Sequence, residues 1–254
     1  MGVVALVPAA GRGERLGYGM PKALVPVDGV PLLVRAVRGL LDSGCVQHVV
    51  IAAPPSDVDI VNTVTAPLAP ADGAVHVVPG GAERSDSVRL ALTYALREIP
   101  DTSIVLVHDA ARAFTPPSVV HAVVDAVAAG HRAVIPVLPV ADTVKQVDSD
   151  GVVVATPDRS ALRVVQTPQG FDAAVLLRAH EAAHEAGLGA TDDAGLVERL
   201  GVPVVTVPGH PDAMKITTRF DLAVAEALLV GGDRGGTRDP ERGTGRGEAR
   251  GGAR

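Results

Sequence analysis

Residues Val3–Leu24 read VVALVPAAGRGERLGYGMPKAL, an apolar run that leads into a glycine-rich loop carrying cations. A buried strand that ends in such a loop leaves backbone N–H groups available to hold an anion, commonly a phosphate. Neither common phosphate motif fits, because the P-loop form needs glycine directly before its lysine and Lys22 follows Pro21. The dinucleotide form needs a third glycine where Leu16 stands. The stretch therefore predicts a first strand that ends in an anion-binding loop of another kind.

The alternation of apolar run and polar loop continues along the chain. Six apolar, β-branched runs are predicted as strands: Val3–Pro8, His48–Ala52, Ala74–Val78, Ile104–His108, Ala133–Val137 and Val204–Val207. Six further patterns are predicted as helices: Leu32–Leu41, Ser85–Leu96, Pro117–Ala129, Ala173–Ala186, Asp192–Leu200 and Arg219–Leu229. This order indicates a Rossmann-like α/β fold, with a mostly parallel, twisted sheet flanked by helices. Ligands of such folds bind beyond the carboxyl ends of the strands.

Composition excludes several classes of protein. The net charge of −6 argues against binding of nucleic acid by bulk electrostatics. The single cysteine, Cys45, excludes an internal disulfide and favours a reducing cytoplasm. No apolar run reaches the roughly 18 residues that a membrane-spanning helix needs. We therefore expect a cytoplasmic protein that binds neither nucleic acid nor membrane.

The chain divides into one domain and a tail. Residues 1–230 carry the alternating pattern, whereas residues 231–254 are rich in Gly and Arg and are predicted to be disordered. Within the domain, residues 138–171 hold two β-rich segments around the turn sequence DSDG at 148–151. A hairpin inserted in this way has no obvious surface of its own domain to pack on. We expect it to reach a second copy of the chain, as the arm of a homodimer.

Two glycines open a second loop, GGAERSDSV at Gly80–Val88. Its backbone amides and the Ser87 hydroxyl can hydrogen-bond the edge of a pyrimidine base. The alternative is structural, with Ser85 or Asp86 capping the helix that follows. The sequence favours neither explanation.

A third loop, VHDAARAF, contains Asp109 at the end of a buried apolar strand. A buried carboxylate is costly unless it is paired or holds a cation, so Asp109 is a candidate ligand for Mg²⁺. The other explanation is an ion pair with Arg112, three residues later. A fourth loop, GHPDAMKITTRFDL, should place Asp212 and Lys215 where the last strand ends.

Together the four loops offer cations, glycines and an acid at one edge of one sheet, a combination that suits a nucleoside triphosphate. Gly11 and Gly13 would let the backbone approach its phosphates, while Arg12, Arg15 and Lys22 could surround them. The chain shows no hydrolytic nucleophile, because no serine lies in a G-x-S-x-G motif and the histidines lack metal-ligand spacing.

Seven segments resemble, in this order, the 2-C-methyl-D-erythritol 4-phosphate cytidylyltransferases: PAAGRGERLG…MPKAL, GGAERSDSV, VHDAARAF, ADTVK, PDRSALRVVQTPQGF, TDDAGLVE and MKITTRFDLAVAE. The resemblance covers about residues 3–230. It implies transfer of CMP from CTP to methylerythritol phosphate, with release of pyrophosphate, in isoprenoid precursor biosynthesis. The substrate phosphate would attack the α-phosphorus in line.

The resemblance also implies roles for particular residues. Arg15 and Lys22 would stabilise the anionic transition state, and Arg159 and Lys215 would position the sugar phosphate. Residues on the substrate side would be Asp109, Arg112, Thr143 and Thr167, and those of the cytidine and phosphate pocket would be Ala9, Ala10, Gly11, Gly13, Gly81 and Ser87.

Two further expectations follow from the resemblance. A divalent cation, Mg²⁺ or another, would take part, with Asp109 and Asp212 as candidate ligands. The hairpin within 138–171 would be the dimer arm, so that Arg159 would enter the active site of the partner.

Two residues depart from the family pattern. Glu14 stands where some members have a second arginine, and Ala82 replaces an acidic residue of the base pocket.

Three other functions compete with this one. A cytidylyltransferase that uses ribitol 5-phosphate would share the residues of the nucleotide side. A dinucleotide-binding oxidoreductase conflicts with Leu16 and with Pro54-Pro55, which stand where a ribose-binding acid is needed. A non-catalytic nucleotide sensor would bind CTP without turnover.

Overall fold

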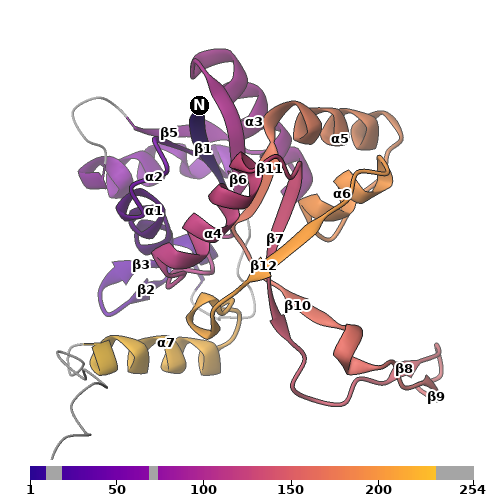
Figure 1. Cartoon of the computed structure of the whole chain (residues 1–254). Coiled ribbons are helices and arrows are strands. Elements are labelled where there is room, and N and C mark those ends of the chain that lie inside the picture. The colour runs from indigo at the N-terminus through magenta and orange to yellow at the C-terminus, as the bar shows by residue number, and fades with distance from the viewer. Residues whose placement is uncertain (10–18, 69–73, 233–254) are drawn as a thin grey trace, which may run out of the picture.

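The computed structural model describes residues 1–9, 19–68 and 74–232, which form a mixed sheet with helices on both faces (Figure 1). The described strands of this sheet run in the order β10-β7-β11-β6-β1-β4-β5, and β12 also pairs with β7. Their bounds are β1 (Gly2–Pro8), β4 (His48–Ala53), β5 (Val75–Pro79), β6 (Thr102–Val107), β7 (Ala133–Pro139), β10 (Arg163–Val165), β11 (Gln169–Asp172) and β12 (Val205–Pro208).

Strand β1 is the centre of the parallel part of the sheet. Its residues Val4 to Val7 have no exposed surface, and it pairs in parallel with β4 on one side and β6 on the other. Strands buried on both faces need near-continuous apolar runs, which explains the valine-rich sequence. Since the strands are parallel, the loops that follow β1, β5 and β6 emerge at one edge, and this edge carries the site described below.

Helices cover both faces of the sheet (Figure 1). The described helices are α1 (Leu32–Asp42), α2 (Val58–Thr65), α3 (Arg84–Glu98), α4 (Pro117–Ala128), α5 (Ala173–Glu185), α6 (Asp193–Arg199) and α7 (Arg219–Gly232). One apolar core lies between the sheet and α3, α5 and α6, and a second lies between the sheet and α1, α2 and α4. A third, smaller core packs α7 against the short hairpin of β2 (Pro26–Val27) and β3 (Val30–Pro31).

The segment from 138 to 171 contributes more to the sheet than an inserted hairpin would. Strand β11 runs antiparallel between β6 and β7, and β10 runs antiparallel to β7. Only the pair β8 (Gln146–Val147) and β9 (Val153–Ala155) stands apart, as a hairpin that projects from the sheet (Figure 1). The carboxylate of Asp148 accepts hydrogen bonds from two backbone N–H groups and closes the turn predicted at 148–151.

The arm, residues 140–162, exposes apolar side chains. Val147, Val152, Val153 and Val154 are 52–59% exposed. The structure holds one chain, so the dimer remains a prediction. An apolar hairpin of this kind is typical of a surface that a second protein covers.

The predicted strands and helices are confirmed to within a few residues at their ends, and the α/β class with them. Several elements are missing from the prediction, among them helix α2, strand β11 and the short strands β2 and β3. Helix α2 has the sequence VDIVNTVT, whose β-branched residues have low helix propensity. Strand β11 is QGFD, in which Phe171 is the one large apolar residue. The predicted cap of α3 is wrong as well, because Glu83 is its N-cap, in a capping box with Asp86.

Two predictions concern regions at the margins of the fold. No helix among the described residues is long and apolar enough to cross a membrane. Helix α7 continues to Gly232, and the tail predicted to be disordered lies outside the described residues from 233 onward. The division of the chain at residue 230 therefore stays a prediction.

Gly170 in β11 provides a test of how tightly the second core is packed. A Cβ atom at Gly170 would overlap with Cγ1 of Val123 and lie 3.1 Å from Cγ2 of Val127. We expect Gly170→Ala to lower the free energy of unfolding by about 1–3 kcal/mol, measured by urea denaturation. Gly189→Ala is the matched control, because no described atom beyond its chain neighbours lies within 4 Å of the added methyl. Equal stability of the two variants would contradict close packing at β11.

Candidate active site

The candidate site lies at the carboxyl edge of the parallel strands, where the segments that follow β5, β6 and β12 meet. Asp109 lies two residues after the end of β6, and the loop after β12 brings Lys215 to it. This second loop is held in place by Ile216, whose N–H donates to the Ala111 carbonyl over 2.9 Å and whose side chain is fully buried. Two loops that are about a hundred residues apart in sequence are thereby fixed side by side.

The carboxylate of Asp109 lies between two cations. Lys215 Nζ is 2.7 Å from its Oδ2, and the Arg84 guanidinium is 3.3 Å from its Oδ1. The side chain is only 12% exposed. Burial alone would raise the pKa of Asp109, but Arg84 and Lys215 together hold it well below its usual range. Asp109 is therefore ionised at physiological pH.

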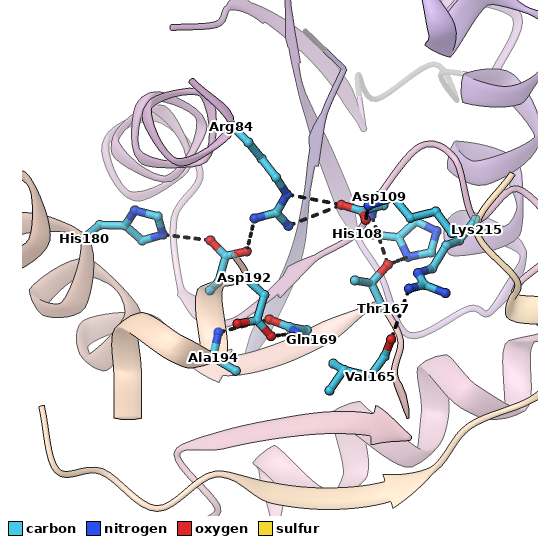
Figure 2. A network of polar contacts seen from close by, with 12 residues as sticks. Arg84, His108, Asp109, Val165, Thr167, Gln169, His180, Asp192, Ala194 and Lys215 are labelled. Atoms are coloured by element: carbon cyan, nitrogen blue, oxygen red, sulfur yellow. Dashed lines mark hydrogen bonds and ion pairs between the residues drawn. The ribbon is translucent and has the colours of Figure 1, made fainter. Parts of the chain in front are cut away.

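Arg84 was missed by the sequence analysis, and it joins two buried acids. Its Nη1 donates to Oδ2 of Asp193 over 2.8 Å, while Nε and Nη2 both donate to Asp109 (Figure 2). His180 Nε2 lies 3.0 Å from the other oxygen of Asp193. Burial would raise the pKa of Asp193, but its contacts with His180 and Arg84 lower it. The signals were present in GGAERSDS and TDDAGLVE, but nothing local in either segment indicates the pairing.

The predicted ion pair between Asp109 and Arg112 is not the one that forms. Nη1 of Arg112 donates to the Ala213 carbonyl over 2.7 Å, and Nη2 donates to the Val165 carbonyl over 3.1 Å. Arg112 therefore fastens three loops of the site together through their backbones. Its predicted place on the substrate side remains a prediction.

Thr167 lies beside Asp109, as expected for a residue of the substrate side. Its Oγ1 accepts a hydrogen bond from the Asp109 N–H over 3.0 Å and lies 3.1 Å from Nδ1 of His108 (Figure 2). His108 is almost wholly buried, and this burial lowers its pKa to about 4. His108 is therefore neutral at physiological pH and serves to orient Thr167.

The segment predicted to form the base pocket, Gly80–Val88, is closed by hydrogen bonds between its own residues. The Ser87 hydroxyl accepts from the Gly81 N–H and donates to the Glu83 carbonyl, both over 3.1 Å. A Cβ at Gly80 would come within 2.9 Å of that hydroxyl, and one at Gly81 would overlap with Asp86. The Ser87 side chain is fully buried, and its hydrogen bonds to Gly81 and Glu83 fix the shape of the loop. The backbone of the loop is the part left to contact a base.

The nucleotide-side residues lie partly outside the described chain. Ala10, Gly11, Gly13 and Arg15 are among the residues that the structure does not describe. Ala9 is buried, and its N–H donates to the Ala52 carbonyl over 2.8 Å, so that β1 and β4 stay paired up to the loop. On the far side of the loop, Lys22 begins the short helix η2 (Lys22–Leu24).

Arg159 and Thr143 lie on the arm, which projects away from the sheet (Figure 1). Both are exposed, and Nη1 of Arg159 donates to the carbonyl of Ala141 on the same arm over 2.6 Å. Within one chain the structure therefore does not bring these two residues to Asp109.

The predicted metal ligands are not grouped. Within the part of the chain that the structure describes, no cluster of three or more His, Cys, Asp or Glu could hold a metal ion. Asp212 lies 3.7 Å from Nδ1 of His210 and is 43% exposed. Asp109 offers one carboxylate, and each of its oxygens meets a single cation, which leaves lone pairs for a further ligand.

His108 makes stability depend on pH. Its folded pKa of about 4 lies below the ordinary 6.5, so between these values only the unfolded chain takes up the proton. The free energy of unfolding should fall as pH falls, by about 2 kcal/mol between pH 6.5 and 5 from this residue. Urea denaturation at pH 7 and pH 5 measures this. The free energy of unfolding should fall less for His108→Gln than for the unsubstituted protein, and the two losses should differ by about 2 kcal/mol.

His131→Gln is the control for this measurement, because His131 is exposed. It should keep the pH dependence of the unsubstituted protein. If His108→Gln keeps that dependence as well, His108 is not the buried neutral group described here.

Comparison with known proteins agrees with the fold. The family profile described as 2-C-methyl-D-erythritol 4-phosphate cytidylyltransferase (IspD) matches residues 3–231. Proteins of that name from Saccharopolyspora erythraea and Nocardia farcinica are 68% and 56% identical to the chain, over 90% and 89% of its length and 100% and 94% of theirs.

Solved structures give the same result. The crystal structure of 2-C-methyl-D-erythritol 4-phosphate cytidylyltransferase from Thermus thermophilus has a TM-score of 0.73 at 38% identity, covering 91% of this chain and 100% of that one. That of 4-diphosphocytidyl-2C-methyl-D-erythritolsynthase from Anaerococcus prevotii has a TM-score of 0.77 at 27% identity, covering 90% and 98%. The chain belongs to the 2-C-methyl-D-erythritol 4-phosphate cytidylyltransferase family.

Proposed function

We propose that this protein transfers CMP from CTP to 2-C-methyl-D-erythritol 4-phosphate, giving 4-diphosphocytidyl-2-C-methyl-D-erythritol and pyrophosphate, in isoprenoid precursor biosynthesis. Family membership over residues 3–231 supports the reaction. The observation that carries it in the structure is the meeting of Asp109, Lys215 and Thr167 at the carboxyl edge of the sheet. There Arg84, from the loop that opens α3, and Lys215, from the loop before α7, both contact Asp109.

The reaction brings two anions together. A phosphate oxygen of the sugar phosphate forms a bond to the α-phosphorus of CTP, and the bond from that phosphorus to the bridging oxygen breaks as pyrophosphate leaves with the electron pair. The attacking phosphate is already ionised, so no side-chain base is needed. Two unit charges 4 Å apart interact by about 1 kcal/mol in water and about 4 kcal/mol at an effective dielectric constant of 20. Fixed cations can offset this repulsion without reorganisation.

Lys215 is suited to hold the incoming phosphate. It is 45% exposed on a fixed loop, and the partner of its ammonium group is Asp109. A phosphate of higher charge would compete for the same ammonium group. In this assignment Lys215 and Arg159 position the sugar phosphate, while Arg15 and Lys22 stabilise the transition state around the α-phosphorus.

A divalent cation could be held at this site by the Asp109 carboxylate together with the phosphates of the substrate. Mg²⁺ is commonly bound by one or two carboxylates together with substrate phosphates, and Asp109 has lone pairs for one such bond. Asp212 would have to turn away from His210 to join it. When bound, Mg²⁺ would neutralise charge on the phosphates of CTP. We propose Asp109 as its protein ligand and keep Asp212 as a second candidate.

The arm supports a homodimer with shared sites. Its exposed valines favour burial against a second chain. Arg159 lies on this arm and not beside Asp109 of its own chain, so it would serve the site of the partner. A single cysteine is typical of a reducing compartment, in agreement with an enzyme of the cytoplasm.

Release of pyrophosphate with Mg²⁺ tests the reaction directly, over CTP and UTP, each with methylerythritol phosphate and ribitol 5-phosphate. We expect turnover with CTP and methylerythritol phosphate alone. Turnover with ribitol 5-phosphate would replace the proposed substrate by the competing one. Binding of CTP without turnover of any pair would show a nucleotide sensor.

Mixed dimers test the sharing of sites. Arg159→Ala and Lys215→Ala should each raise the KM for the sugar phosphate more than the KM for CTP. After refolding the two variants together at equal amounts, half of the dimers are mixed, and each mixed dimer holds one site with neither substitution. About a quarter of all sites should then regain normal turnover below the KM of the sugar phosphate.

The control for this experiment mixes Lys215→Ala with Asp109→Asn. These residues pair within one chain, so every site of a mixed dimer keeps one defect and no recovery is expected. Absence of recovery in the mixture with Arg159→Ala would place Arg159 in the site of its own chain, or in none.

A further inference from the structure

A second carboxylate lies buried behind the candidate site. Asp193 at the start of α6 is 1% exposed, and both of its oxygens are engaged, by His180 of α5 and by Arg84 of α3. Arg84 in turn reaches Asp109 (Figure 2). We call these five residues the Asp193 network: His180, Asp193, Arg84, Asp109 and Lys215.

The charge of Asp193 is not needed to build α6. The helix already has an N-cap, since Asp192 accepts a hydrogen bond from the Gly195 N–H over 3.1 Å. Asp192 is itself fixed by Gln169, whose Nε2 donates to it over 2.7 Å. Packing of α5 and α6 on the sheet comes from apolar side chains, among them Leu176 and Leu196. A buried ion pair is often no more stabilising than apolar residues of similar volume, so stability alone does not explain Asp193.

The geometry of Arg84 indicates another purpose. Its planar guanidinium meets Asp193 with one edge and Asp109 with the other, so its orientation is fixed at both ends. Arg84 holds only Oδ1 of Asp109, whereas Lys215 holds Oδ2. If Lys215 turned to a phosphate, Arg84 would still hold Oδ1, and Oδ2 could accept a hydrogen bond from a substrate hydroxyl.

We propose that Asp193, locked by His180, is a positioning residue that sets Arg84, and through it Asp109, for binding the polyol part of the sugar phosphate. This role rests on the proposed function, because it assumes that Asp109 faces that substrate. Asp193 itself touches no substrate. Its effect should therefore be passed entirely through Arg84.

The first test compares two neighbouring substitutions in the full-length enzyme. Asp193→Asn removes the buried charge, and Asp192→Asn removes a charge next to it while keeping a good N-cap. We expect Asp193→Asn to lower kcat/KM for the sugar phosphate by at least about tenfold, with KM for CTP changed by less than about twofold. Asp192→Asn should leave both values within about twofold. Equal losses in the two variants would overturn the proposal.

A double-mutant cycle separates positioning from general stability. If Asp193 acts through Arg84, then Asp193→Asn should cause no further loss in an enzyme that already carries Arg84→Ala. A tenfold loss in both backgrounds would show a structural role. Should Asp193→Asn not fold, His180→Leu provides the same comparison, since it removes the residue that locks Asp193 and puts an apolar side chain of similar size in its place.

The Arg84 Nε–H signal in a ¹H–¹⁵N spectrum gives a readout without turnover. We expect one sharp, slowly exchanging signal in the unsubstituted enzyme and in Asp192→Asn, and a broadened one in Asp193→Asn. A sharp signal in Asp193→Asn would overturn the proposal. Lack of turnover by the unsubstituted enzyme would instead refute the proposed function, and the spectrum would still report whether Asp193 holds Arg84.

Discussion

The ionised carboxylate of Asp109, which follows the buried residues Ile104–Val107 of β6, is the group that the rest of the site is arranged around. Removal of a carboxylate from water is unfavourable unless nearby cations compensate for it. Arg112 of its own loop forms no ion pair with it, because its guanidinium is bound to backbone carbonyls, and its charge lowers the pKa of Asp109 less than Arg84 and Lys215 do. The two cations come from the start of α3 and from the loop before α7, so one buried charge draws together three loops of the sheet edge.

The need to compensate the charge of Asp109 accounts for the placement of the start of α3, which supplies Arg84, and of the loop before α7, which supplies Lys215. Helix α3 starts at Arg84 directly after a loop that only glycine can close, and it is capped by side chains of its own first turn. The loop before α7 is tied to the loop after β6 through Ile216. The ion pairs of Asp109 and the backbone hydrogen bond of Ile216 therefore hold the same loops together.

Much of this could be predicted from the sequence, for definable reasons. The apolar runs and their spacing locate the strands and helices, because each kind of element buries its apolar side chains in a pattern that repeats within a few residues. Asp109 could be singled out because a charge after VLV must be compensated. Helix α2 could not be found, because its β-branched residues favour a strand until they pack on the sheet. The pairing of Arg84 with Asp193 spans 109 residues, and no local pattern encodes a contact of that separation.

The antiparallel segment β10–β11 joins the arm to Thr167 in one unbroken stretch of chain, and Thr167 is bonded to the backbone of Asp109. If the proposed dimer and the proposed site are right, association of two chains and binding of the sugar phosphate therefore act on the same few residues. Thermodynamic linkage makes any such coupling reciprocal. If dimer formation tightens the binding of substrate by some factor, substrate must tighten the dimer by that same factor, and an enzyme short of substrate would then exchange its subunits faster than one that is saturated.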